Sequence, residues 1–112
     1  MAVRPTRFYS KKQESKVAKT VGGQRTPNSG ATPFSKGDVT TDLILIECKT
    51  KVTPSNSMSV KKEWIDKNRE EAFAMNRPYS AVAIDFGDGE NYYIIDEKLF
   101  RKLQEYLRGE EK

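Results

Sequence analysis

The stretch that decides the fold is GDVTTDLILIECKT, residues 37–50. A tight turn in its middle predicts two adjacent antiparallel strands, over residues 38–40 and 43–50. The second strand begins with apolar residues on both faces, which is typical of a central strand covered by helices on both sides. It then carries charges at Glu47 and Lys49, and a charged group is costly on a segment that leaves water. This conflict between burial and charge needs a chemical reason.

Hydrophobic periodicity and turn residues predict the elements on either side of this strand pair. Together they indicate a single α/β domain over residues 1–112, with a mixed sheet flanked by helices and residues 1–7 as a flexible basic arm. The expected elements are a helix over 8–21, a short strand near 32–35, a helix over 60–75, a hairpin of strands over 79–86 and 91–95, and a last helix capped by Asp96 with a stripe of Leu99, Leu103 and Leu107.

The composition excludes several kinds of site. One cysteine and no histidine leave no intramolecular disulfide, no Cys/His zinc site and no nucleophile paired with histidine. The longest apolar run, over residues 43–46, is too short to span a membrane, and residues 1–10 lack the hydrophobic centre of a signal peptide. We therefore expect a cytoplasmic protein whose chemistry depends on carboxylates, lysines, hydroxyls or a hard metal ion.

Positive charge is concentrated at the start of the chain. Residues 1–36 hold eight Lys and Arg side chains against Glu14 alone, a net +7, and the remainder carries −3 of the total +4. A basic segment on a slightly acidic body is typical of a polyanion partner, most often nucleic acid. A disordered, solubilising tail would have the same composition.

The charges that end the central strand fit a metal site. Because side chains alternate along a strand, Glu47 and Lys49 share a face, and the short turn brings Asp38 beside Glu47. Two adjacent carboxylates suit Mg²⁺, and the backbone carbonyl of Cys48 would be a further ligand. Lys49 would then orient or help deprotonate an attacking water and stabilise negative charge on the phosphate. An exposed cross-strand ion pair without function remains the alternative.

Four fragments in order resemble the PD-(D/E)xK nuclease superfamily. They are a first helix bearing Glu14, SGA at residues 29–31, KGDV at 36–39 and LIECKT at 45–50. Within that superfamily the likeness is to the small Holliday junction resolvases of archaea and to resolvase-like nucleases of bacteriophages. The resemblance implies a restriction-endonuclease-like α-β-β-β-α-β core, with a C-terminal strand and helix added. It also implies Mg²⁺-dependent cleavage of DNA that leaves a 5′-phosphate, with Mn²⁺ as a substitute, in host cytoplasm if the chain is phage-encoded.

The resemblance assigns roles to particular residues. Asp38 and Glu47 match the metal-binding acids, joined by the Cys48 carbonyl, and Lys49 matches the catalytic lysine. Glu14 matches a glutamate that contacts the metal directly or through water. Gly37 stands where the name motif has proline, and Asp42 competes with Asp38 for its role. The residues expected to contact DNA are Lys11, Lys12, Arg25, Ser29, Gly30, Lys36, Lys51, Lys61 and Lys62.

The twofold symmetry of a four-way junction favours a homodimer with two cutting centres. Its interface is expected either on the helix around Trp64 and Phe73 or on the end segment with Tyr92, Phe100 and Tyr106. Two other functions fit the same residues: a nuclease of this fold that acts on other DNA structures, and a DNA-binding module without catalysis.

Overall fold

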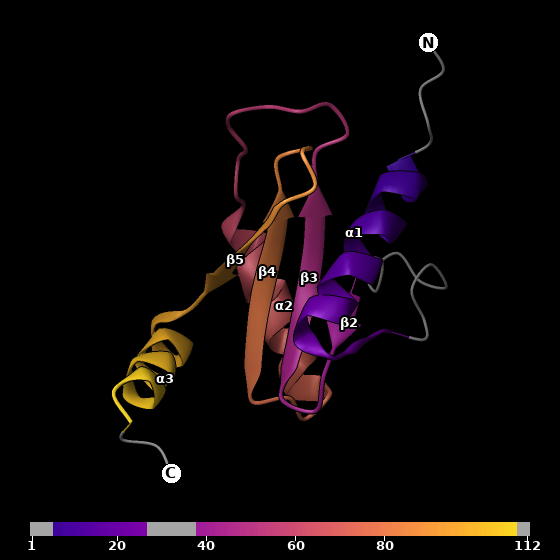
Figure 1. The fold of residues 1–112 in the computed structure, drawn as a ribbon. Coiled ribbons are helices and arrows are strands. Elements are labelled where there is room, and N and C mark those ends of the chain that lie inside the picture. Colours follow the sequence, from indigo (N-terminus) through magenta and orange to yellow (C-terminus); the bar gives the residue numbers. More distant parts are fainter. Residues whose placement is uncertain (1–5, 27–37, 110–112) are drawn as a thin grey trace.

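The computed structural model describes residues 6–26 and 38–109. Figure 1 shows the arrangement of the helices and strands. In chain order they are α1 (Thr6–Val21), β1 (Gln24–Arg25), β2 (Asp38–Thr40), β3 (Ile44–Thr50), α2 (Lys62–Ala74), β4 (Tyr79–Asp85), β5 (Asn91–Ile95) and α3 (Glu97–Leu107).

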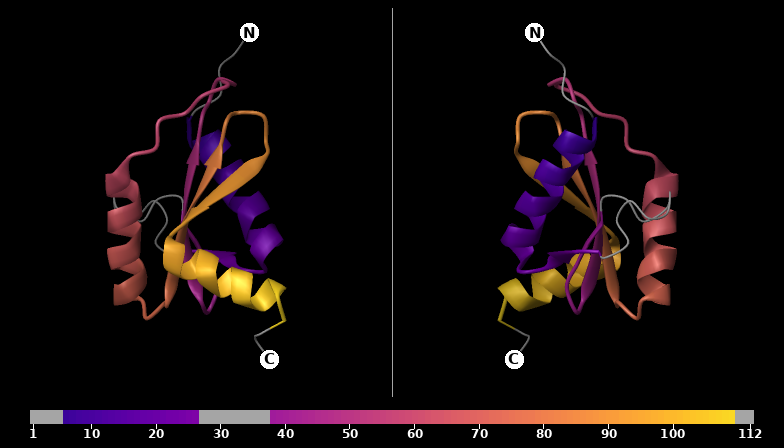
Figure 2. Two further views of the ribbon diagram at one scale, coloured as in Figure 1. Left: turned by 90° about the vertical axis from the view of Figure 1, so that its left-hand side faces the viewer. Right: turned by 90° about the vertical axis from the view of Figure 1, so that its right-hand side faces the viewer.

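The strands form one five-stranded sheet in the order β1-β2-β3-β4-β5. β3 and β4 are parallel, because the chain crosses back through α2 between them, and the other neighbouring strands are antiparallel. α1 and α2 cover opposite faces of the sheet (Figure 2). The α/β class and the mixed sheet between helices are therefore confirmed.

The core lies mainly between α1 and the sheet. Val17 of α1 is fully buried against Val39, Ile46, Ala81 and Ala83. These strand residues alternate with side chains that point toward α2, so β3 is covered on both faces as its sequence predicts. On the α2 side of β3 the fully buried Leu45 precedes Glu47 and Lys49, so apolar packing gives way to polar residues along this strand.

A buried glutamine fastens α1 to the two central strands. Gln13 Nε2 donates hydrogen bonds to the carbonyl oxygens of Lys49 and Ala83, at 2.9 and 3.2 Å, and to Asn91 Oδ1 at 3.0 Å. Burying a polar group is favourable only when such partners are present. The contact places α1 across the end of β3 and β4.

Several element boundaries differ from the sequence prediction. α1 begins at Thr6, so Thr6 and Arg7 belong to the helix and not to a flexible arm. The expected strand near 32–35 lies outside the described residues, whereas β1 (Gln24–Arg25) was not predicted, because two residues are too few to show an alternating pattern. α2 begins at Lys62 and leaves Val60 exposed.

The cap of the last helix is confirmed, since Asp96 Oδ1 accepts from the backbone N–H of Leu99 at 2.9 Å. The helices formed by residues 6–26 and 38–109 include none that is long and apolar enough to cross a membrane.

Candidate functional site

The strand register brings the predicted acids together. Asp38 of β2 lies directly opposite Glu47 of β3 in the antiparallel ladder. Opposite residues in such a ladder project from the same face, and Lys49 follows on that face two residues later. Since Ile46 and the half-buried Cys48 pack toward α1, the three charged side chains project toward α2. The prediction that Asp38 lies beside Glu47 is confirmed.

The ammonium of Lys49 is held between an acid and an aromatic ring. Lys49 Nζ lies 3.2 Å from Glu47 Oε2 and 4.8 Å from the centre of the Trp64 ring. Trp64 is in the first turn of α2, and its half-buried ring covers the lysine from the helix side. A cation over an indole face is attracted by the ring quadrupole. These two contacts direct the amine toward the acid pair.

Asp38 is a buried carboxyl group among other carboxylates. It is 4% exposed, and burial is the main reason why its pKa is raised to about 8. The negative charges of Glu71, Glu47 and Glu14 raise the pKa further, in that order, and the charge of Lys49 lowers it. Asp38 therefore holds its proton near neutral pH unless a cation compensates for the negative charge around it.

Glu71 of α2 is a site residue that the sequence prediction missed. Its pKa is raised, first by burial and then by the charge of Glu47, which places it on the side of the sheet that carries the acid pair. Trp64, Asn68 and Glu71 are spaced by four and three residues, the spacing of side chains on one face of a helix. That helical spacing is the signal available in the sequence, but it does not by itself show which face of the helix meets the acid pair.

Glu14 approaches the site from the other helix. It is 3% exposed on α1, and its Oε1 accepts from Arg25 Nε at 3.0 Å. The charge of Glu14 nevertheless contributes to the raised pKa of Asp38 and of the Cys48 thiol. Glu14 thus lies near the β2 edge of the sheet on the α1 side, and Arg25, expected to contact DNA, is occupied by this ion pair.

The side chain of Cys48 packs against the core, whereas its backbone lies beyond the end of the β2–β3 ladder. Its half-buried thiol packs against the α1-side core, and burial, followed by the charge of Glu14, raises the pKa of that thiol. A thiol with a raised pKa is a poor nucleophile, which agrees with a packing role. The β2–β3 ladder ends at Asp38 and Glu47, so none of the described β2 residues is opposite Cys48.

The described ranges, 6–26 and 38–109, contain no group of three or more His, Cys, Asp or Glu side chains placed to hold a metal ion together. The acids of the site are the adjacent pair Asp38 and Glu47, and the charges of Glu71 and Glu14 act on the pKa of Asp38 from a longer distance. One or two carboxylates are the usual protein share of a magnesium site, which water and substrate phosphate complete.

The basic residues predicted to contact DNA are dispersed. Lys11 and Lys12 are exposed on α1, whereas Lys61 and Lys62 are exposed at the start of α2, on the opposite face of the sheet. Lys62 also pairs with Asp66 at 2.9 Å. Lys51 follows β3 and is half-buried. The remaining candidates, Ser29, Gly30 and Lys36, lie outside the described residues.

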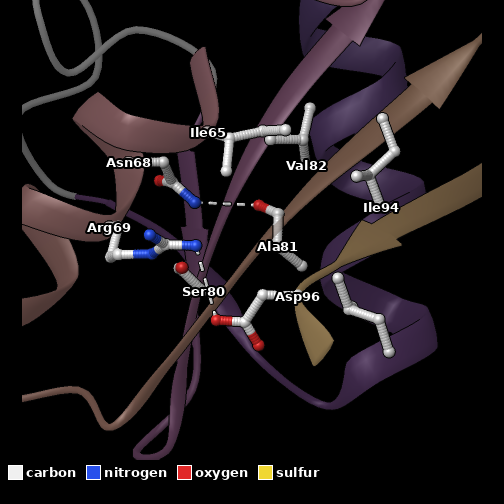
Figure 3. A pocket seen from close by; sticks show the side chains of 9 residues that line it. Ile65, Asn68, Arg69, Ser80, Ala81, Val82, Ile94 and Asp96 are labelled. Carbon is white, nitrogen blue, oxygen red and sulfur yellow. Dashed lines mark hydrogen bonds and ion pairs between the residues drawn. The ribbon is translucent and has the colours of Figure 1, made fainter. Parts of the chain in front are cut away.

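A separate pocket of about 200 Å³ lies between α2 and strands β4 and β5 (Figure 3). Across it, Asn68 Nδ2 donates to the Ala81 carbonyl at 2.9 Å, and Arg69 forms an ion pair with Asp96 at 3.6 Å. Asn68 Nδ2 also donates to the Leu45 carbonyl at 3.1 Å. The residues that line the pocket do not include the acid pair, so we attribute it to the packing of α2 on the sheet.

Comparisons with known proteins leave the family open. No family model, no curated protein and no solved structure matches this chain. The five-stranded sheet supports the α/β class without assigning a particular fold family. A functional assignment therefore depends on the chemistry of Asp38, Glu47 and Lys49.

Proposed function

We propose that the chain is a Mg²⁺-dependent, structure-selective DNA endonuclease of the PD-(D/E)xK type, with a restriction-endonuclease-like core. Its substrate would be branched DNA such as a Holliday junction, and its product would carry a 5′-phosphate. The observation that carries the proposal is the register of Asp38 opposite Glu47, with Lys49 on the same face and its Nζ 3.2 Å from Glu47 Oε2. Two acids that can bind a metal ion, with an ammonium beside them, are groups that can support metal-dependent phosphodiester hydrolysis.

The donor set fits a divalent cation. Burial, and then the charges of the neighbouring carboxylates, raise the pKa of Asp38 to about 8, and a cation bound there would favour its charged form and so oppose that shift. Carboxylate and carbonyl oxygens are the ligands that Mg²⁺ prefers. Asp38, Glu47 and the Cys48 carbonyl would hold the ion, with Glu14 contributing through water. When bound, the ion supplies a water of lowered pKa and neutralises charge on the phosphate.

Lys49 is the residue that would act on the reacting groups. Glu47 and Trp64 restrict its ammonium to the side of the acid pair, so it would reach a phosphate oxygen or an attacking water bound there. An ammonium stabilises the negative charge that develops on phosphate during in-line attack by water. The exposed lysines Lys11, Lys12, Lys61 and Lys62 would contribute attraction to the DNA backbone that does not depend on sequence.

Cleavage of a four-way junction and of a supercoiled cruciform plasmid, with Mg²⁺ and with EDTA, tests the proposal. We expect the wild type to cleave in Mg²⁺ and not in EDTA. Glu47→Gln keeps the shape of the side chain and removes its charge, and this variant should not cleave. Asp42→Asn is the matched control, because Asp42 is exposed in the β2–β3 turn, at the other end of the ladder from Asp38 and Glu47, and should not be needed. Cleavage by Glu47→Gln at the wild-type rate would refute the metal-ligand assignment.

Lys49→Met separates catalysis from metal binding. We expect this variant to bind Mn²⁺ and junction DNA as the wild type does while single-turnover cleavage falls at least a hundredfold, because the lysine acts on the reacting groups and is not a ligand. Cleavage of duplex DNA in place of junctions would favour the same-fold nuclease that acts on other DNA. DNA binding without any Mg²⁺-dependent cleavage would favour the non-catalytic module, in which Lys49 and Glu47 are simply an ion pair.

A further inference from the structure

α3 (Glu97–Leu107) presents an apolar face to solvent. Phe100, Leu103, Tyr106 and Leu107 are 51%, 42%, 66% and 66% exposed, and no residue of this fully described helix is buried. Figure 1 shows α3 standing away from the sheet beyond β5. An isolated helix of this length is marginal in water, and its stability normally comes from packing of its apolar face. The exposed face therefore indicates a docking surface.

Contacts at its first turn fix the direction of α3. Asp96 caps the helix and forms an ion pair with Arg69 of α2 at 3.6 Å. Lys98 Nζ donates to the Pro78 carbonyl at 3.3 Å. These contacts hold the start of the helix on the body and leave the apolar face accessible.

The apolar pattern of α3 is the same when read in either direction. In LFRKLQEYL, residues 99–107, the apolar positions are symmetric about Leu103. We propose that α3 docks antiparallel on α3 of a second copy, with a twofold axis at Leu103. Leu99 then faces Leu107 of the second copy, Phe100 faces its Tyr106, and Leu103 faces itself. A surface that contacts its own copy through a twofold axis must be complementary to itself, and this symmetric pattern meets that requirement.

The charges of α3 are compatible with the same arrangement. Glu97 forms an ion pair with Arg101 of the same helix at 3.5 Å, and antiparallel pairing leaves this ion pair on the side away from the apolar face. The helix dipoles are then also opposed, which is the favourable orientation for two adjacent helices. At 3.6 residues per turn, Arg101 and Glu105 fall on the side away from the apolar face, where Arg101 is exposed and Glu105 is half-buried.

This pairing leaves the acid pair accessible. α3 follows β5, at one edge of the sheet, whereas Asp38 and Glu47 lie on β2 and β3 toward the other edge. A dimer formed through α3 would thus carry two separate, twofold-related acid sites. The pairing itself does not rest on the proposed cleavage activity, so each is tested without the other.

Sedimentation of the full chain without DNA tests the proposal. At tens of micromolar we expect the wild type at twice the chain mass of 12.8 kDa. Leu103→Glu should sediment as a monomer, because it opposes two carboxylates at the twofold axis. Arg101→Glu is the control, since it adds an acid on the other side of the helix, and it should remain a dimer. A wild-type monomer, or equal dissociation of both variants, would overturn the proposal.

Cross-linking locates the contact. Cys48 is the chain's single cysteine, so Leu103→Cys in a Cys48→Ala background places one thiol at the proposed axis. We expect oxidation to give a covalent dimer with Leu103→Cys and not with Arg101→Cys, as the two thiols can approach only at the axis. The reverse result would overturn the proposal. So would a monomer that co-sediments with vesicles of anionic phospholipid, which would assign the apolar face to a membrane surface.

Discussion

Replacing Asp38 by asparagine should stabilise the fold, and the gain should grow with pH. The side chain is 4% exposed and lies opposite Glu47, and asparagine keeps its shape while removing its charge. The pKa of Asp38 is raised from 3.8 to about 8 in the folded chain. The unfolded chain therefore loses this proton near pH 4 and the folded chain loses it only near pH 8, so wild-type stability falls as pH rises between these values.

The size of the effect follows from the pKa shift. Within this window each pH unit lowers the free energy of unfolding of the wild type by about 1.4 kcal/mol relative to a chain without the titrating group. From pH 5 to pH 8 the advantage of Asp38→Asn should therefore grow by about 4 kcal/mol. Glu71 and Glu47 are present in both proteins, so the two proteins differ only in the group at position 38.

Urea unfolding at pH 5 and pH 8, in EDTA, measures the difference. Asp42→Asn is the matched control, because it makes the same exchange at an exposed position of the β2–β3 turn, and it should change the free energy of unfolding by less than about 0.5 kcal/mol. An Asp38→Asn advantage of equal size at both pH values would refute the reasoning. Adding Mg²⁺ at pH 8 should stabilise the wild type and not Asp38→Asn, because a ligand that binds the folded state raises its stability.

Two further predictions concern packing and DNA affinity. Asn68→Ala should lower the free energy of unfolding by about 2–4 kcal/mol, because it removes hydrogen bonds to the Leu45 and Ala81 carbonyls inside the core. The control Glu70→Ala, on the exposed side of α2, should change it by less than about 0.5 kcal/mol. If urea unfolding shows the same decrease in midpoint for both variants, this role of Asn68 is contradicted. Changing Lys11 and Lys12 to glutamine should weaken binding to junction and duplex DNA alike, and should reduce the slope of the logarithm of the DNA-binding constant against the logarithm of salt concentration by up to about 2. Loss of junction binding alone would instead indicate a specific contact.

Local patterns were sufficient to predict most elements of this fold. The apolar run of β3, bounded by a short turn, predicts a central strand, and the same turn places Asp38 beside Glu47. The cap at Asp96 follows from side-chain chemistry within four residues. The start of α2 was placed two residues early, because the apolar side chain of Val60 continues the helical pattern but lies in solvent.

Residues distant in the sequence complete the candidate site, and local patterns do not locate them. Glu71, which lies on α2, raises the pKa of Asp38, and Trp64 of the same helix covers Lys49. Both depend on how the β3–α2–β4 crossover packs on the sheet. β1, with two residues, has no periodicity of its own and exists because β2 offers it an edge.

By itself, the sequence determined the α/β class, the strand pair with its two acids and a lysine, and the amphipathic character of the last helix, because each depends on side-chain order over a few residues. Only the tertiary structure decided that the stripe of Leu99, Leu103 and Leu107 stays outside the core, and that Asp38 is buried among carboxylates from three other elements. Burial and Coulomb interactions depend on distances between elements, and those distances exist only once the helices have packed on the sheet.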